Sequence, residues 1–250
     1  DWSPDGSTLL LGEMISANES YLWLCDVKTG TRELLTPKTE KPVARDAAQF
    51  SADGKEVFLT SDEGGEFKQL GRMSLTERKF IPITKDTPWD VEAFDLSPEE
   101  TLLASVVNQS GPGVLRILST ADDGSAPATP PLPPGVIGGM EWTEDGREIG
   151  FSMTGARSPA DAWSLEVATS KLTRWTESEA GGLDPSTFVE PSLIKVKSFD
   201  GLTVSGFLYS PDAKKFPGKR PVLINIHGGP EGQSRPIFQA RNNYYLNELG

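Results

Sequence analysis

The sequence predicts a mainly β protein made of two architectures in series. Three observations carry this prediction: a turn motif that occurs four times, an apolar run that ends in a pair of glycines, and a change in charge along the chain. Residues 191–250 contain eight Lys or Arg and four Asp or Glu, whereas residues 1–190 contain sixteen and thirty-two. Two regions of such different composition favour two domains.

The turn motif recurs at a nearly constant interval. Its Ser or Thr lies at positions 3, 51, 97 and 143, so the intervals are 48, 46 and 46 residues. In each copy we expect an apolar residue to end a strand in the core, Ser or Thr and Asp to bind local backbone groups, and Gly to adopt a positive φ. Glu100 replaces this Gly in the third copy, which predicts a looser turn or another turn type. The copies are Trp2-Ser-Pro-Asp-Gly6, Phe50-Ser-Ala-Asp-Gly54, Leu96-Ser-Pro-Glu-Glu100 and Trp142-Thr-Glu-Asp-Gly146.

Apolar segments follow each turn and predict further strands. After the second turn they lie at 57–60, 69–75 and 79–84. Four strands in every ~40–50 residues is the pattern of a β-propeller blade, so residues 1–176 are predicted to form a partial β-propeller of about four blades. Closed propellers usually have more blades, and we therefore expect the chain to begin within the propeller. The corresponding first strands are expected at 9–15, 102–107 and 149–153, and the second strands at 21–27, 114–119 and 162–167.

The pattern changes after residues 177–192, which are expected to form a linker. Residues 194–199 and 203–209 flank Asp200-Gly201, a dipeptide that is typical of a tight hairpin turn. A polar connection then leads into a second apolar segment. The hairpin is expected to open a second domain that occupies residues 193–250.

Two further elements are expected in this domain. The apolar run 222–226 predicts a buried strand, and apolar residues at helical spacing predict a helix at 238–249. A hairpin, a buried strand and a helix in this order are typical of the N-terminal part of an α/β-hydrolase domain. We expect this domain to be truncated at Gly250.

Composition argues against several classes of function. The net charge of −12 is unfavourable for binding nucleic acid, which requires clustered Lys and Arg. No apolar run approaches the ~18 residues of a membrane helix. Cys25 is the single cysteine and is expected to be a small buried hydrophobe. One His without ligands at suitable spacing predicts no metal site, and no cofactor is expected. The sequence gives neither the compartment, cytoplasmic or exported, nor the oligomeric state.

The apolar run 222–226 leads directly into His227-Gly228-Gly229-Pro230. An apolar strand that ends at a glycine pair is how an α/β-hydrolase builds half of its oxyanion hole. A TolB-like propeller followed by a hairpin and this loop resembles the prolyl oligopeptidase family of serine peptidases, in particular its acylaminoacyl-peptidase or dipeptidyl-peptidase-like branch. The resemblance covers the whole chain, and the combination is more specific than either part.

The resemblance implies roles for three residues of this loop. Gly229 would donate its backbone N–H to the oxyanion of the tetrahedral intermediate, and Gly228 would permit the loop conformation. His227, the only histidine, would order the loop and not act as the triad base, because this fold places the base after the serine. The sequence contains no Gly-x-Ser-x-Gly motif. The catalytic Ser, Asp and His are therefore expected beyond Gly250, and the chain alone is expected to be inactive.

The resulting hypothesis is part of a serine peptidase that cleaves short peptides by acyl-enzyme chemistry, with the propeller controlling access to the active site. Two alternatives remain open. One is a propeller that serves as a binding module beside a degenerate hydrolase. The other is an esterase or amidase that acts on small acyl substrates, because the same oxyanion chemistry serves esters. The sequence does not indicate the cleavage specificity.

Overall fold

The computed structural model describes residues 1–85, 87–121, 126–229 and 231–250. The chain divides into two compact units: the first comprises Asp1–Asn108 and Leu115–Thr129, and the second comprises Gln109–Val114 and Pro130–Gly250. This division groups residues by proximity, and the domain boundaries at 176 and 193 remain a prediction. None of the described helices is long and apolar enough to span a membrane.

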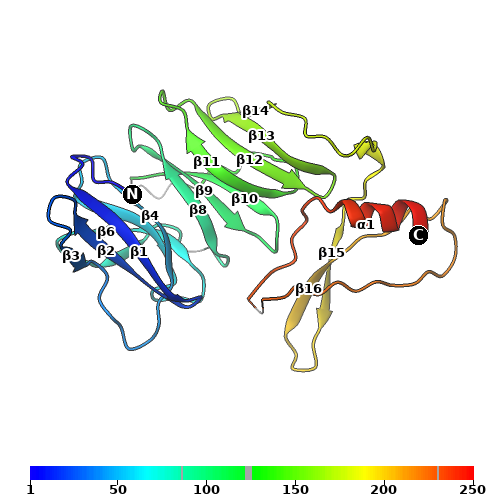
Figure 1. Ribbon diagram of the computed structural model, residues 1–250, viewed down its shortest axis with the longest axis horizontal. Coiled ribbons are helices and arrows are strands. Elements are labelled where there is room, and N and C mark those ends of the chain that lie inside the picture. Colours follow the sequence, from blue (N-terminus) through cyan, green and yellow to red (C-terminus); the bar gives the residue numbers. More distant parts are fainter. Residues whose placement is uncertain (86, 122–125, 230) are drawn as a thin grey trace. The chain divides into compact units, whose positions relative to one another are not determined.

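The first unit contains three sheets, and each corresponds to one repeat of the sequence (Figure 1). Hydrogen-bonded neighbours in these sheets are consecutive in the chain, as in propeller blades. The first two residues of β10 belong to the second unit. The first sheet contains β1 (Thr8–Ser16), β2 (Glu19–Asp26) and β3 (Arg32–Leu34), the second β4 (Arg45–Phe50), β5 (Glu56–Ser61), β6 (Gln69–Ser74) and β7 (Phe80–Pro82), and the third β8 (Val91–Leu96), β9 (Leu102–Asn108) and β10 (Gly113–Ser119).

The second unit contains a fourth sheet of the same kind and the elements that follow it. The fourth sheet consists of β11 (Val136–Trp142), β12 (Glu148–Gly155), β13 (Ser158–Glu166) and β14 (Lys171–Arg174), all antiparallel. A short 3₁₀ turn, η1 (Pro185–Thr187), precedes the predicted hairpin, which is present as β15 (Ser192–Lys197) and β16 (Thr203–Leu208). The predicted helix is present as α1 (Ala240–Tyr244), continued by the π-helical turn η2 (Tyr245–Leu249). The mainly β architecture with several blade-like sheets is confirmed.

The core of the first unit lies between neighbouring sheets, and β5 shows why. Successive side chains of a strand point to opposite faces. Val57 and Leu59 therefore join an apolar cluster with the first sheet, whereas Phe58 joins a cluster with the third. Both faces of β5 are buried, which agrees with its three consecutive apolar residues, Val57, Phe58 and Leu59. The first cluster is Leu10, Leu22, Leu35, Phe50, Val57, Leu59, Met73 and Phe80, and the second is Phe58, Leu70, Val91, Leu96, Leu103 and Val107.

All four repeated turns have the same backbone geometry. The residue at the end of each motif donates its N–H to the carbonyl of the Ser or Thr three positions earlier, at 2.8–2.9 Å. The expectation of a different third turn is wrong, because Glu100 adopts a φ of 52° where the glycines have 66–68°. The Glu100 carboxylate accepts a hydrogen bond from the Ala52 N–H in the preceding turn. Its carbonyl also accepts one from the Thr120 hydroxyl at 2.5 Å, and these contacts offset the backbone strain.

The apolar residue before each turn is buried in only two of the copies. Phe50 and Leu96 are 6% and 7% exposed, as expected. Trp2 is 57% exposed, and Trp142 is half-buried. Placing the Trp2 ring in the core is therefore wrong: this residue forms an isolated bridge with Leu9 and does not extend a strand.

A second repeat consists of threonines that follow the last strand of the first, second and fourth sheets. The hydroxyl oxygens of Thr36, Thr84 and Thr176 each accept a hydrogen bond from the backbone N–H fourteen residues earlier, at 2.9–3.0 Å. The three donors are the N–H groups of Leu22, Leu70 and Ala162. Each hydroxyl thus replaces a ladder hydrogen bond where the last strand ends, which satisfies a donor of the neighbouring strand.

Candidate functional site

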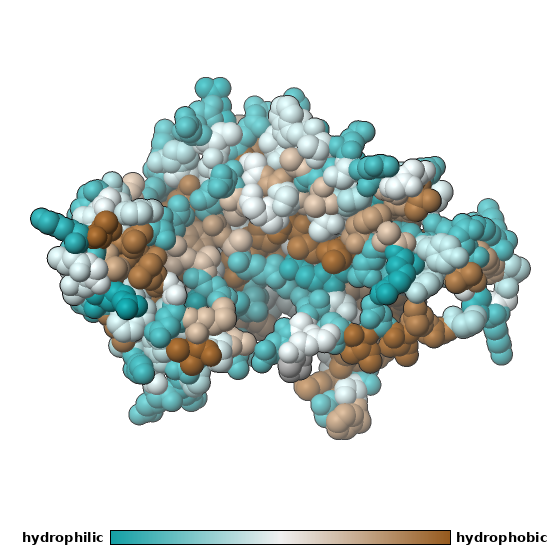
Figure 2. Space-filling model, viewed as in Figure 1, coloured by the Kyte–Doolittle hydropathy of each residue, from teal (hydrophilic) through white to brown (hydrophobic). Residues whose placement is uncertain are grey.

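The apolar segment that precedes the candidate oxyanion loop (227–230) pairs with no strand among the described residues. Val222, Leu223, Ile224 and Ile226 are 74–81% exposed, so the expected buried strand at 222–226 is wrong for this structure. An extended segment becomes a buried strand only when neighbouring strands accept its backbone hydrogen bonds, and the described residues provide none. Figure 2 shows apolar side chains on the visible surface where this segment and the hairpin β15–β16 lie in Figure 1.

Gly229 has the backbone conformation that demands a glycine in this loop. Its φ is 136°, which L side chains rarely adopt. A Cβ at this position would lie 3.0 Å from the backbone nitrogens of Glu231 and Gly232. The local fold therefore disfavours a side chain at Gly229, which is exposed. Pro230, the last residue of the motif, lies outside the described residues.

Gly228 differs from its neighbour in both respects. Its φ is not in the positive range, and a Cβ there would meet no atom within 4 Å. Of the pair, Gly229 is the residue whose conformation the loop requires. The role expected for Gly228 in shaping the loop stays a prediction.

His227 lies against the turn that follows it. The ring is exposed, and its Nδ1 lies 3.3 Å from the carbonyl oxygen of Gly228. The chain folds back so closely that a Cβ at Gly232 would lie 3.0 Å from Nδ1 and 2.5 Å from the Gly228 oxygen. This packing is compatible with a His that orders the loop, which remains a prediction.

A residue just after the loop is held by the connection between β9 and β10. The Nε of Arg235 donates to the carbonyl oxygen of Gly111 at 2.6 Å. Gly111 has a φ of 115°, and a Cβ there would lie 2.7 Å from Cζ of Phe207 and 3.6 Å from Cδ of Pro236. The connection thus contacts β16 and the segment after the candidate oxyanion loop together. The sequence did not indicate this contact, because any residue offers a backbone carbonyl.

A second contact lies three residues further along, at the hairpin between β12 and β13. The backbone N–H of Phe238 donates to Oγ1 of Thr154 at 3.5 Å, and the Phe238 ring lies 5.5 Å from that of Phe188. The same hairpin carries Arg157, whose guanidinium donates to the carbonyl of Ser186 at 3.1 Å. The fourth sheet therefore contacts both the predicted linker and the segment after the candidate loop.

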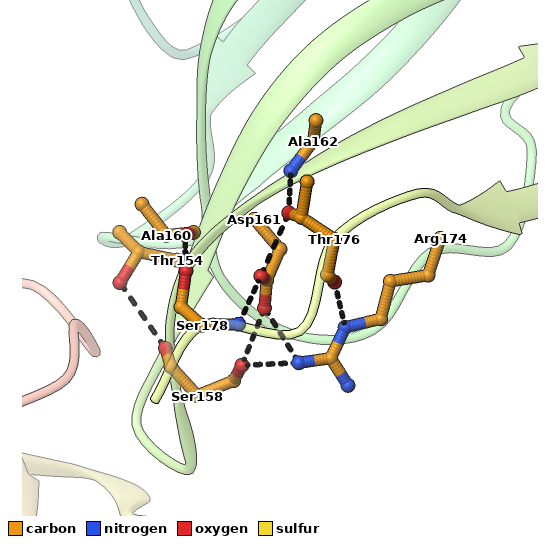
Figure 3. A network of polar contacts seen from close by, with 8 residues as sticks. All are labelled: Thr154, Ser158, Ala160, Asp161, Ala162, Arg174, Thr176 and Ser178. Atoms are coloured by element: carbon orange, nitrogen blue, oxygen red, sulfur yellow. Dashed lines mark hydrogen bonds and ion pairs between the residues drawn. The ribbon is translucent and has the colours of Figure 1, made fainter. Parts of the chain in front are cut away.

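This hairpin is supported by a buried carboxylate, Asp161 (Figure 3). Its side chain is fully buried and accepts four hydrogen bonds, two to each oxygen. Ser158 and Arg174 donate to Oδ2 at 3.0 and 2.5 Å, while the Thr176 hydroxyl and the Ser178 N–H donate to Oδ1 at 2.9 and 2.7 Å. The network thus fixes the start of β13 and the end of β14 to each other.

The ionisation of Asp161 follows from this setting. Burial by itself would raise the pKa of Asp161, but the N–H of Ser178 and the side chains of Arg174, Thr176 and Ser158 hold it down to about 2. The carboxylate is therefore charged at neutral pH. A repeat of Thr at the ends of the last strands was present in the sequence and could have indicated this position.

Comparison with known proteins supports the architecture. No family model matches the chain, and no curated protein sequence matches it. Among solved structures, a puromycin hydrolase aligns with 98% of this chain and 39% of its own, at 17% identity and a TM-score of 0.80. Prolyl oligopeptidase B from Galerina marginata aligns with 98% and 35%, at 16% identity and a TM-score of 0.79. TolB from Acinetobacter baumannii aligns with 82% and 50%, at 19% identity and a TM-score of 0.58.

These similarities show a shared fold, and they agree with the resemblance predicted from the sequence. A prolyl oligopeptidase, a puromycin hydrolase and a TolB protein all match the chain. The chain spans about a third to a half of the structures it matches.

Proposed function

We propose that the protein is a serine hydrolase of the prolyl oligopeptidase type that cleaves short peptides. In this proposal the catalytic Ser attacks the peptide carbonyl, a His transfers the proton, and the backbone N–H of Gly229 binds the developing oxyanion. The propeller restricts access to short peptides. The residues 193–250 form the start of the catalytic domain.

The observation that carries the proposal is the order of blade-like sheets, a hairpin and a loop whose Gly229 has a φ of 136°. An oxyanion donor must approach the substrate without an intervening Cβ, and this conformation excludes one. The enzymes that share the fold are named as hydrolases and oligopeptidases, which supports the same class for this protein.

The proposal is tested by labelling and turnover. The full-length protein is incubated with a fluorophosphonate probe and with chromogenic peptides of increasing length. We expect one labelled serine and a fall in turnover as the peptides lengthen. The 250-residue chain, which contains one His and no Gly-x-Ser-x-Gly motif, should show neither labelling nor turnover. Full-length protein without a labelled serine would favour the binding module instead.

The oxyanion assignment is tested by a matched pair of neighbouring glycines. Gly229→Val should lower kcat by ~10²–10³, the usual cost of losing one oxyanion donor. Gly228→Ala should change kcat little, because its φ is not positive and the space around it is open. His227→Ala should reduce activity less than loss of the catalytic Ser. Near-normal kcat in Gly229→Val, or complete inactivity in His227→Ala, would refute these assignments.

A second candidate is hydrolysis of small acyl substrates. It is favoured by one observation: an enzyme whose solved structures share the fold is named a puromycin hydrolase. The full-length protein separates the two candidates through the ratio of kcat/KM for a short peptide and for a small aryl ester or amide. A preference for the small substrate would replace the peptidase proposal.

A further inference from the structure

We propose that Gly111, in the connection between β9 and β10, is a positioning residue for the candidate oxyanion loop. This inference rests on the proposed function. Gly111 would act through Arg235, which lies six residues after Gly229 and donates to the Gly111 carbonyl at 2.6 Å. The connection would thus be a socket, defined here as Gln109–Pro112, that receives the segment after the loop.

The socket has a defined shape. The backbone N–H of Gln109 donates to the carbonyl of Pro112 at 3.0 Å, which closes the connection. Ser110 and Gly111 both have positive φ, 60° and 115°. Two such residues in succession turn the Gly111 carbonyl toward Arg235. Residues 109–114 belong to the second compact unit, although they connect two strands of the third sheet.

The socket is also closely packed. The Phe207 ring occupies the space that a side chain at position 111 would need, because a Cβ there would approach Phe207 Cζ to 2.7 Å. Cδ of Pro236 lies at 3.6 Å, an ordinary contact distance. A contact below 3.0 Å requires one of the two groups to move. The two contacts below 3.0 Å involve Cζ and Cε2 of the Phe207 ring on β16, so an added methyl would displace this ring. It would also strain the backbone at a φ of 115°, whose carbonyl binds Arg235.

The position of the candidate loop depends on this support because little holds the chain before it. Residues 222–226 are exposed and unpaired among the described residues. After the loop, Arg235 contacts the socket and Phe238 contacts Thr154 of the fourth sheet. A displacement of about 1 Å can cost ~10²-fold in rate, so a shift of the Arg235 segment should appear in kcat.

The test uses full-length protein and two substitutions with a matched control. Gly111→Ala adds a Cβ in the socket, whereas Gly64→Ala adds one at another positive φ, 84°, where no atom lies within 4 Å. Arg235→Ala removes the guanidinium without backbone strain, and Arg235→Lys retains one donor. We expect a fall in kcat of ~10–100-fold for Gly111→Ala and Arg235→Ala with little change in KM, near-normal values for Gly64→Ala, and partial recovery in Arg235→Lys.

Hydrogen exchange provides a readout that does not depend on activity. Peptides that cover residues 227–238 should exchange faster in Gly111→Ala and Arg235→Ala than in wild type or Gly64→Ala. Equal exchange in Gly111→Ala and Gly64→Ala would refute the socket. Faster exchange with unchanged kcat would refute positioning. If the wild-type protein shows no hydrolase activity, the proposed function fails, while hydrogen exchange still decides whether the socket holds the loop.

Discussion

The second and fourth sheets each have a threonine of the repeat after their last strand, and the hydroxyls of these two threonines bind different acceptors. In the second sheet, the Thr84 hydroxyl accepts from the Leu70 N–H at 3.0 Å and donates to Oε1 of Gln69 at 2.9 Å. In the fourth sheet, Thr176 accepts from the Ala162 N–H and donates to Asp161, both at 2.9 Å. The two acceptors occupy equivalent places, and only one of them is charged.

The charge difference between Gln69 and Asp161 determines how many backbone and side-chain donors each residue binds. The Gln69 amide both accepts and donates. Its Nε2 donates to the Thr87 carbonyl at 2.9 Å, so Gln69 binds two residues of the same short segment, Thr84 and Thr87. A carboxylate only accepts, and Asp161 therefore gathers four donors, including Arg174 and the N–H of Ser178. The charged version lies where the chain leaves the sheet for the predicted linker. The repeat thus keeps its backbone hydrogen bonds, while Asp161 in place of a neutral residue also binds the segment that leaves the fourth sheet.

The largest effect expected from this comparison concerns Asp161→Ala. It leaves Arg174, Thr176 and the Ser178 N–H without their acceptor, and should lower the free energy of unfolding by about 3 kcal/mol. Gln69→Ala should cost only about 1 kcal/mol, because it removes neutral hydrogen bonds. Urea-unfolding midpoints measure both values. Equal losses would show that the charge at Asp161 adds nothing.

The pH dependence of the same position gives the next largest effect. The pKa of Asp161 is lowered from 3.8 to about 2, so its stabilisation is fully present above pH ~4 and is lost as the pH falls toward ~2. The shift corresponds to roughly 2 kcal/mol. The difference in unfolding free energy between wild type and Asp161→Asn should be constant from pH 7 to 5 and shrink below pH 4. A constant difference down to pH 2 would contradict the assignment.

The loss of stability on replacing a threonine of the repeat should increase with the burial of its hydroxyl. Thr36 is fully buried, so Thr36→Val leaves the Leu22 N–H without a partner and should cost about 1–2 kcal/mol. Thr176 is exposed, and water can replace its hydroxyl, so Thr176→Val should cost about 0.5 kcal/mol. Thermal unfolding of both variants compares them directly. A larger loss at Thr176 would show that its bond to Asp161 dominates.

The smallest effect is expected at the third turn. Glu100→Gly relieves a φ of 52° but removes the carboxylate bond to the Ala52 N–H. The two contributions have opposite sign and similar size, so unfolding free energy should change by less than about 0.5 kcal/mol. Chemical denaturation measures this. A clear loss would show that the contact between neighbouring turns outweighs the backbone strain.

The sequence predicted the strands well where a local rule applied. The intervals of 48, 46 and 46 residues predicted the repeated sheets, and Asp200-Gly201 predicted the hairpin β15–β16. Thr36, Thr84 and Thr176 also recur in the sequence, at intervals of 48 and 92 residues, although no prediction was drawn from them. Backbone geometry in a strand or turn depends on a few neighbouring residues, and these signals lie within that range.

The sequence did not predict what depends on distant partners. The run 222–226 has the composition of a buried strand, yet it lies exposed, because strand pairing requires a neighbour that composition does not supply. Position 100 carries a Glu where the other turns have Gly. It still adopts a positive φ like those glycines, because contacts with Ala52 and Thr120 offset the strain.

The sequence by itself determined the class of fold, the repeat and the loop that carries the candidate oxyanion donor, since each depends on local periodicity and turn chemistry. Only the tertiary structure decided that Arg235 binds the Gly111 carbonyl, 124 residues away, and that Asp161 is the charged centre of the exit from the fourth sheet. A backbone carbonyl carries no sequence signal, and a carboxylate becomes a buried acceptor only when the folded chain brings donors to it.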